Sequence, residues 1–299
     1  MGHHHHDHHH HHTDEKNLSI AFFLNLVFTI IEFIGGLYTN SIAILSDALH
    51  DLGDSFSLGL AWYFQKLSKK KGDQEYSYGY KRFSLLGAII NSIVLVVGSI
   101  FIIIESIKRF QAPQETDAQG MMFLAILGIV FNGLAAWKLH GGYSHNEKVI
   151  SLHLLEDILG WVAVLIGSII IYFTDYYRID SILSFAISLF ILTRVLKSLK
   201  STMEVVLQKF PENIDRKNVI DFLESNNKIG SYHDMHIWSM DGQYNVMTIH
   251  VVLINADSDI DRTSLKSELR SGLKKLGIDH ATIEMEEAGE ECIFEKDAC

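Results

Sequence analysis

The sequence contains very few of the residues that kink or cross-link a chain. Its 299 residues include two prolines, Pro113 and Pro211, and two cysteines, Cys292 and Cys299. Both prolines fall in segments that connect longer apolar runs, so helices kinked by proline are not expected. Two cysteines near one end exclude a fold held together by a disulfide framework.

Charged side chains are almost missing from long stretches of the first 200 residues. Between Phe83 and Ile107 the only one is Glu105, and from Gly120 to Trp137 there is none. A run of about 20 apolar residues is long enough to cross a bilayer as a helix. These runs exclude both a disordered chain and a single soluble domain.

Six apolar segments follow one another in this part of the chain. Because the hydrocarbon core leaves no partner for an unpaired backbone group, each is expected to be a transmembrane α-helix. The six segments are 18–39, 41–65, 83–108, 120–138, 149–173 and 179–199, within a membrane domain of residues 18–200.

Residues 204–299 have a different composition, with 19 acidic and 10 basic side chains. This acidic balance argues against a nucleic-acid partner. Helical patterns at 215–225 and 264–276 alternate with strand-like patterns at 232–239, 244–254 and 281–286. The order α-β-β-α-β predicts a small two-layer α+β domain.

The loops indicate how the chain crosses the membrane. If the N-terminus is cytosolic, twelve lysines and arginines lie inside and three, Lys108, Arg109 and Arg178, lie outside. Positive residues accumulate on the cytosolic side, so both termini and the acidic domain are predicted to be cytosolic. No pattern of a cleavable signal peptide is visible.

The first 17 residues hold nine of the seventeen histidines. This segment has two interpretations. It is either a purification tag or a native His-rich cytosolic segment that binds zinc weakly.

Ionisable residues inside apolar segments are functional candidates because lipid penalises them. The second segment carries His50 and Asp54, and the fifth carries His153 and Asp157. A spacing of four places each pair on one helix face. Two imidazoles and two carboxylates predict a four-coordinate site for Zn²⁺, with Cd²⁺ or Co²⁺ as further candidates. The alternative is a hydrogen-bonded polar cluster that only joins the helices.

Three further carboxylates accompany these pairs, and the fifth segment adds Glu156. Asp47 and Asp51 lie on the same face of the second segment as His50 and Asp54, within an arc of about 100°. Glu32 is in the first segment. We expect Glu32, Asp47 and Asp51 to orient the ligands or to carry protons.

Several motifs resemble the cation diffusion facilitator family, in its zinc-transporting bacterial branch. The resemblance rests on four stretches: Asn25 to Asp54, Tyr78-Gly-Tyr-Lys-Arg-Phe83, Leu152 to Gly160, and His233-Asp-Met-His-Ile-Trp-Ser239. It implies a homodimeric, proton-coupled exporter of the bacterial inner membrane with six helices and a cytosolic ferredoxin-like domain. Asp51 departs from the family pattern, where an apolar residue is usual, so an extra carboxylate or broader ion tolerance is expected.

By the same resemblance, four residues of the cytosolic domain match positions that bind regulatory zinc in some relatives: His233, His250, His280 and Glu286. The alternative is that they are ordinary histidines at strand edges. Cys292 and Cys299 resemble the cysteine-bearing tails of some relatives. The loop between the second and third segments has no histidine, so no metal site is expected there.

A membrane metalloenzyme and a passive channel are the two rival functions. A zinc enzyme usually leaves one coordination position open, whereas four inward ligands fill the shell. No His-Glu-x-x-His motif, Ser/His/Asp layout or phosphate-binding loop for ATP is present. A passive channel needs weak sites in series instead of one tight site. We therefore expect a transporter without enzymatic activity.

Overall fold

The computed structural model describes residues 26–68, 70–139, 145–254 and 261–290. The chain forms two compact units. One consists of Met1–Tyr63 and Gly87–Leu199, and the other of Phe64–Leu86 and Lys200–Cys299. The histidine-rich segment 1–17 and the residues Cys292 and Cys299 lie outside the described ranges.

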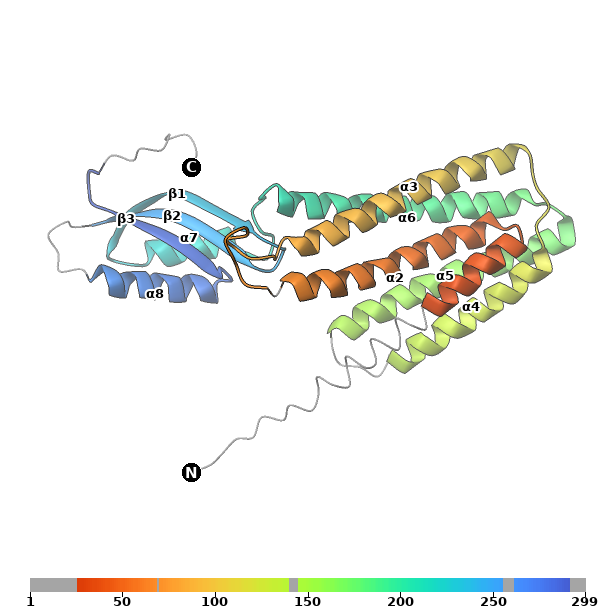
Figure 1. Ribbon diagram of the computed structural model, residues 1–299, viewed down its shortest axis with the longest axis horizontal. Coiled ribbons are helices and arrows are strands. Elements are labelled where there is room, and N and C mark those ends of the chain that lie inside the picture. Colours follow the sequence, from red (N-terminus) through yellow and green to blue (C-terminus); the bar gives the residue numbers. More distant parts are fainter. Residues whose placement is uncertain (1–25, 69, 140–144, 255–260, 291–299) are drawn as a thin grey trace, which may run out of the picture. The chain divides into compact units, whose positions relative to one another are not determined.

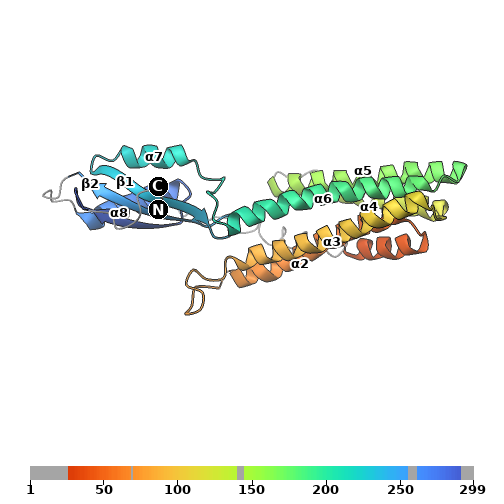
Figure 2. The ribbon, with the colours of Figure 1, turned by 90° about the horizontal axis from the view of Figure 1, so that it is seen from above.

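The first unit is a bundle of helices that run side by side (Figures 1 and 2). Each helix corresponds to one predicted apolar segment: Leu26–Tyr38, α2 (Ile42–Ser68), α3 (Phe83–Gln111), α4 (Ala118–Leu139), α5 (His145–Thr174) and α6 (Arg178–Val206). Within the described residues, three stretches are long and apolar enough to cross a membrane, namely Phe83–Gln111, Leu155–Thr174 and Arg178–Val206. Leu26–Tyr38 and Ala118–Leu134 are shorter apolar helices, and α2 carries several aspartates.

The bundle is apolar outside and partly polar inside. Phe101, Phe123 and Phe173 are each more than 60% exposed, whereas Glu32 is 0% exposed and Asp51 is 4% exposed. A water-soluble protein would expose its carboxylates and bury most of these rings. The reversed arrangement fits a bundle surrounded by lipid, in which ionisable groups turn toward the interior.

Small polar residues of α6 join it to two other helices. Ser188 hydrogen-bonds Ser46 of α2 at 2.7 Å, and Ser106 of α3 donates to Ser184 at 2.9 Å. Both contacts are buried. Small hydroxyl side chains allow helix backbones to approach closely in lipid and still satisfy their hydrogen bonds.

The helices α4 and α5 meet at a glycine. A Cβ atom added at Gly128 would lie 2.4 Å from the ring of Trp161, which is fully buried. Only glycine permits this approach, so the indole fills the space that any larger residue would occupy. Phe28 packs edge-on against the same ring, with centroids 6.0 Å apart.

The second unit contains the predicted α-β-β-α-β domain. Its elements are α7 (Arg216–Glu224), β1 (Ile229–Ser239), β2 (Asn245–Leu253), α8 (Arg262–Lys275) and β3 (His280–Glu286). The sheet has the order β1-β2-β3, with β1 and β2 antiparallel and β2 and β3 parallel. Aspartates cap both helices, and Gly277 follows α8 with a φ of 91°.

One face of this sheet is covered by the two helices. The apolar core joins Val219 and Leu223 of α7 and Leu265, Leu269 and Leu273 of α8 to the alternating residues of the strands. The opposite face of the sheet carries the other residues of each strand, among them His236, His250, Glu284 and Glu286. Polar and ligand-type side chains are thus collected on one surface.

The loop between α2 and α3 belongs to the second unit. Asp73 organises it by accepting hydrogen bonds from the backbone N–H of Tyr76 at 2.9 Å and from the Tyr80 hydroxyl at 2.8 Å. These bonds, led by the Tyr76 N–H, lower the pKa of Asp73 to about 2. The loop also contacts the sheet domain, where Lys81 lies over the Tyr244 ring at 4.3 Å.

Candidate metal sites

Inside the bundle, four carboxylates from three helices come together. Glu32 of the first helix is close enough to Asp51, Asp47 and Asp157 to interact with them electrostatically. A Cβ atom added at Gly160 of α5 would lie 3.8 Å from Asp47 Oδ1. The faces of α2 and α5 that were predicted to carry ligands therefore point into the bundle interior, on the side of the first helix.

The four predicted ligands are described to different degrees. His50 and Asp157 are half-buried on α2 and α5. Asp54 and His153 belong to the same two helices, but their side chains lie outside the described part of the structure. A four-residue His₂Asp₂ site therefore remains a prediction, whereas the gathering of Glu32, Asp47, Asp51 and Asp157 is observed.

In the sheet domain, His233, His250 and Glu286 form a compact group. One ligand atom of each lies within 4.8 Å of the others. His250 Nδ1 is 2.6 Å from Glu286 Oε1, and His233 Nε2 is 3.3 Å from Glu286 Oε2. His250 and Glu286 are 7% and 5% exposed, so water does not compete freely for them. Two imidazoles and one carboxylate are a donor set that suits Zn²⁺.

A bulge in β1 helps to build this group. The register with β2 shifts between His233 and His236, and Asp234 has a φ of 50°. Asp234 Oδ1 contacts His236 Nε2 at 2.7 Å, and its Oδ2 lies 3.6 Å from His250 Nε2. Bulges redirect individual side chains, and here the bulge adds a carboxylate beside the histidines.

Sequence reasoning overlooked Asp234 and Glu284, whose Oε2 lies 3.5 Å from His250 Nε2. The signal for Glu284 was its spacing of two from Glu286, which puts both on one face of a strand. The structure does not bring His280 to the group. That residue begins β3, pairs with Val246, and packs edge-on against Tyr78 with ring centroids 5.7 Å apart.

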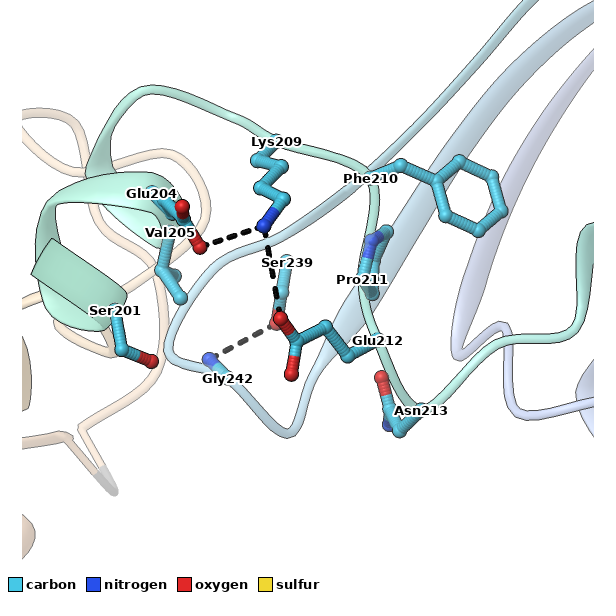
Figure 3. A pocket seen from close by; sticks show the side chains of 10 residues that line it. All are labelled: Ser201, Glu204, Val205, Lys209, Phe210, Pro211, Glu212, Asn213, Ser239 and Gly242. Atoms are coloured by element: carbon cyan, nitrogen blue, oxygen red, sulfur yellow. Dashed lines mark hydrogen bonds and ion pairs between the residues drawn. The ribbon is translucent and has the colours of Figure 1, made fainter. Parts of the chain in front are cut away.

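A separate pocket of about 210 Å³ lies where α6 continues into the sheet domain (Figure 3). Lys209 projects across it, with its Nζ 2.7 Å from Glu204 Oε2 and 3.6 Å from Glu212 Oε1 (Figure 3). The hydrogen bond to Glu204 raises the pKa of Lys209. The lysine that crosses this pocket is therefore already paired with two carboxylates.

Comparison with known proteins identifies both units. The cation efflux transmembrane domain family matches residues 18–207, and the cytoplasmic domain family of cation efflux proteins matches residues 211–288. The chain is 37% identical over 280 residues to a "Cadmium, cobalt and zinc/H(+)-K(+) antiporter" of Bacillus velezensis, covering 92% of this chain and 90% of that protein.

Other relatives match this chain over a similar share of its length. The "Metal cation efflux system protein CzcD" of Cupriavidus metallidurans is 34% identical, with 91% of this chain and 87% of the relative covered. The "Zinc transporter ZitB" of Escherichia coli is 33% identical over the same shares of both chains. Domain matches of this extent, the reversed polarity of the bundle and its buried carboxylates lead to one conclusion: the chain belongs to the cation efflux family of integral membrane transporters, which are not enzymes.

Proposed function

We propose that the protein exports Zn²⁺ from the cytosol in exchange for protons. The observation that carries this proposal is the meeting of Glu32, Asp47, Asp51 and Asp157 in the bundle interior. Carboxylates buried in an apolar bundle are retained where a cation or a proton must be stabilised. The names of the relatives support divalent transition-metal ions as the substrate class.

His50, Asp54, His153 and Asp157 are the proposed ligands of the transported ion, in a His₂Asp₂ site. Imidazole nitrogens favour borderline ions such as Zn²⁺, Cd²⁺ and Co²⁺ over hard ions. Glu32, Asp47 and Asp51 then orient these ligands or accept protons.

Proton coupling follows from ligand chemistry. A metal ion binds neutral imidazole and ionised carboxylate, so protons and Zn²⁺ compete for the same site. An ordinary imidazole titrates near pH 6.5, close to physiological pH. A proton that enters from the outer side displaces the metal outward when the site alternates between the two sides. No ATP is needed for this exchange.

The assembly belongs to the same proposal. Six helices cross the inner membrane of a bacterium, both termini are cytosolic, and the chain forms a homodimer through its ferredoxin-like domain. The proposed limits are a His-rich segment 1–17, a membrane domain 18–200 and a cytosolic domain 204–299. The group of His233, His250 and Glu286 binds a regulatory Zn²⁺. Cys292 and Cys299 are further candidate ligands outside the described residues.

The test is zinc flux into sealed proteoliposomes that contain a zinc-sensitive fluorophore. We expect faster uptake when the interior is acidic and at least one proton moved outward per ion, with the flux abolished in Asp157→Ala. Flux that ignores a pH gradient of either sign at fixed membrane potential would indicate a passive channel. A parallel potassium gradient tests the second counter-ion that the relative's name suggests.

A further inference from the structure

The helices α5 and α6 are joined by an ion pair that the proposed transport mechanism does not use. Arg194 of α6 donates through Nη1 to Glu156 Oε2 and through Nη2 to Glu156 Oε1, the second bond at 2.6 Å. Two parallel bonds between a guanidinium and a carboxylate fix the orientation as well as the distance. Arg194 also lies over the Phe190 ring of its own helix, at 4.9 Å.

This ion pair is unusual for its position. The side chains of Arg194 and Glu156 are 45% and 38% exposed on the bundle, which belongs to an integral membrane protein. An exposed pair in water contributes little, because water and salt screen it. Where lipid instead of water surrounds such a pair, this screening is lost, and either partner alone is poorly accommodated.

Glu156 immediately precedes Asp157, and the two side chains point about 100° apart around the helix axis. Glu156 faces α6, while Asp157 faces Glu32 of the first helix and Gly160 faces Asp47 of α2. The pair with Arg194 therefore opposes rotation of α5 about its axis. With side chains about 5–6 Å from that axis, a rotation of roughly 20° would move the Asp157 carboxylate by about 2 Å. Zinc sites tolerate deviations of only about 0.2 Å in ligand distance.

We propose that Glu156 and Arg194 are positioning residues of the transport site. They hold α5 in the rotation that presents Asp157 to the transported cation, without touching the ion themselves. The inference rests on the proposed function, in which Asp157 is a ligand. It extends that function by assigning the orientation of Asp157 to a contact on another face of α5, about 100° away around the helix axis.

The experiment measures zinc flux by the full-length protein in proteoliposomes, over a range of zinc concentrations. Glu156→Gln and Arg194→Gln should each raise the KM for zinc about tenfold, as expected when a group that orients a metal ligand is removed, while the maximal rate changes less than about threefold. Arg194→Lys should give an intermediate KM, because an ammonium cannot form the two parallel bonds. Lys197→Gln is the matched control, which removes the same charge from the same helix and should leave the KM unchanged.

The exchanged double variant, Glu156→Arg with Arg194→Glu, tests whether the pair itself matters. Recovery of the KM toward the wild-type value supports positioning. If the exchanged chain does not fold, the neutral pair Glu156→Gln with Arg194→Gln decides. A KM for zinc in this double variant that is no higher than in either single variant supports the proposal. A KM raised by the product of the two single effects overturns it. Single variants with a KM within twofold of wild type overturn the proposal as well. Asp157→Ala separates the two levels. Lost flux in Asp157→Ala together with an unchanged KM in the Glu156 and Arg194 variants overturns the positioning role alone, whereas retained flux in Asp157→Ala refutes the ligand assignment and the positioning role with it.

Discussion

Asp180 at the start of α6 caps the N-terminus of α2 across the bundle. Its Oδ1 accepts a hydrogen bond from Ser41 Oγ at 2.5 Å, and its two oxygens accept bonds from the backbone N–H groups of Ile42 and Ala43 at 2.9 and 3.2 Å. Asp180 is 1% exposed. The helix that carries His50 and Asp51 is thus anchored at its first turn by a buried carboxylate, where a negative charge also complements the helix dipole.

Replacement of Asp180 by alanine should destabilise the bundle. It leaves two buried N–H groups of α2 without an acceptor, at a cost of about 1–3 kcal/mol for each. Asp180→Asn keeps one acceptor oxygen and should have a smaller effect. Thermal unfolding of the detergent-solubilised protein measures both. Asp175→Asn, in the exposed loop before α6, is the control. A melting temperature for Asp180→Ala within about 1 °C of wild type would mean that the cap contributes nothing.

Replacement of His50 by aspartate should change which ion is transported. A carboxylate is a harder ligand than an imidazole and therefore favours harder ions. The ratio of Zn²⁺ to Mn²⁺ transport should fall about tenfold. Competition between the two ions in proteoliposomes gives the ratio. Leu52→Ala, an exposed apolar position on the same helix, controls for general damage to α2. An unchanged ranking of the ions would remove His50 from the ligands.

Zinc should stabilise the full-length protein through the group in the sheet domain. A ligand present at 100 times its Kd adds about 2.7 kcal/mol to the stability of the state that binds it. His250→Ala and Glu286→Gln should reduce the zinc-dependent rise of the melting temperature, whereas His280→Ala should not, because His280 packs against Tyr78 instead. The opposite ranking of His250 and His280 would refute the assignment.

Asp73 should hold the loop between α2 and α3 in place at neutral pH. Its pKa is lowered from 3.8 to about 2, so the ionised form stabilises the folded loop above the unfolded pKa, and this contribution is lost as the pH falls from about 4 to about 2. At pH 7, Asp73→Asn should expose Lys70 and Lys71 to faster cleavage by trypsin. Glu75→Gln in the same loop is the matched control. Equal cleavage rates in the two variants would show that the Asp73 hydrogen bonds do not order the loop.

Local patterns in the sequence were sufficient to predict the helices and strands of this protein. Apolar runs predicted the helices of the bundle, and helical and strand-like patterns predicted the order α-β-β-α-β, because these signals arise between residues a few positions apart. The spacing of four in His50/Asp54 and His153/Asp157 likewise requires only helix geometry. The motifs also indicated the family that the comparisons establish.

Tertiary packing alone decided the pairings between distant residues. Ser41 and Asp180 are 139 positions apart, and Glu156 and Arg194 are 38 apart. A sequence pattern shows the face of a helix on which a residue lies, but it does not show which helix packs against that face. The bulge at Asp234 and the separation of His280 from His250 have the same origin. Strand register and backbone conformation depend on the whole sheet and its packed helices, so neither follows from the residue types of one strand.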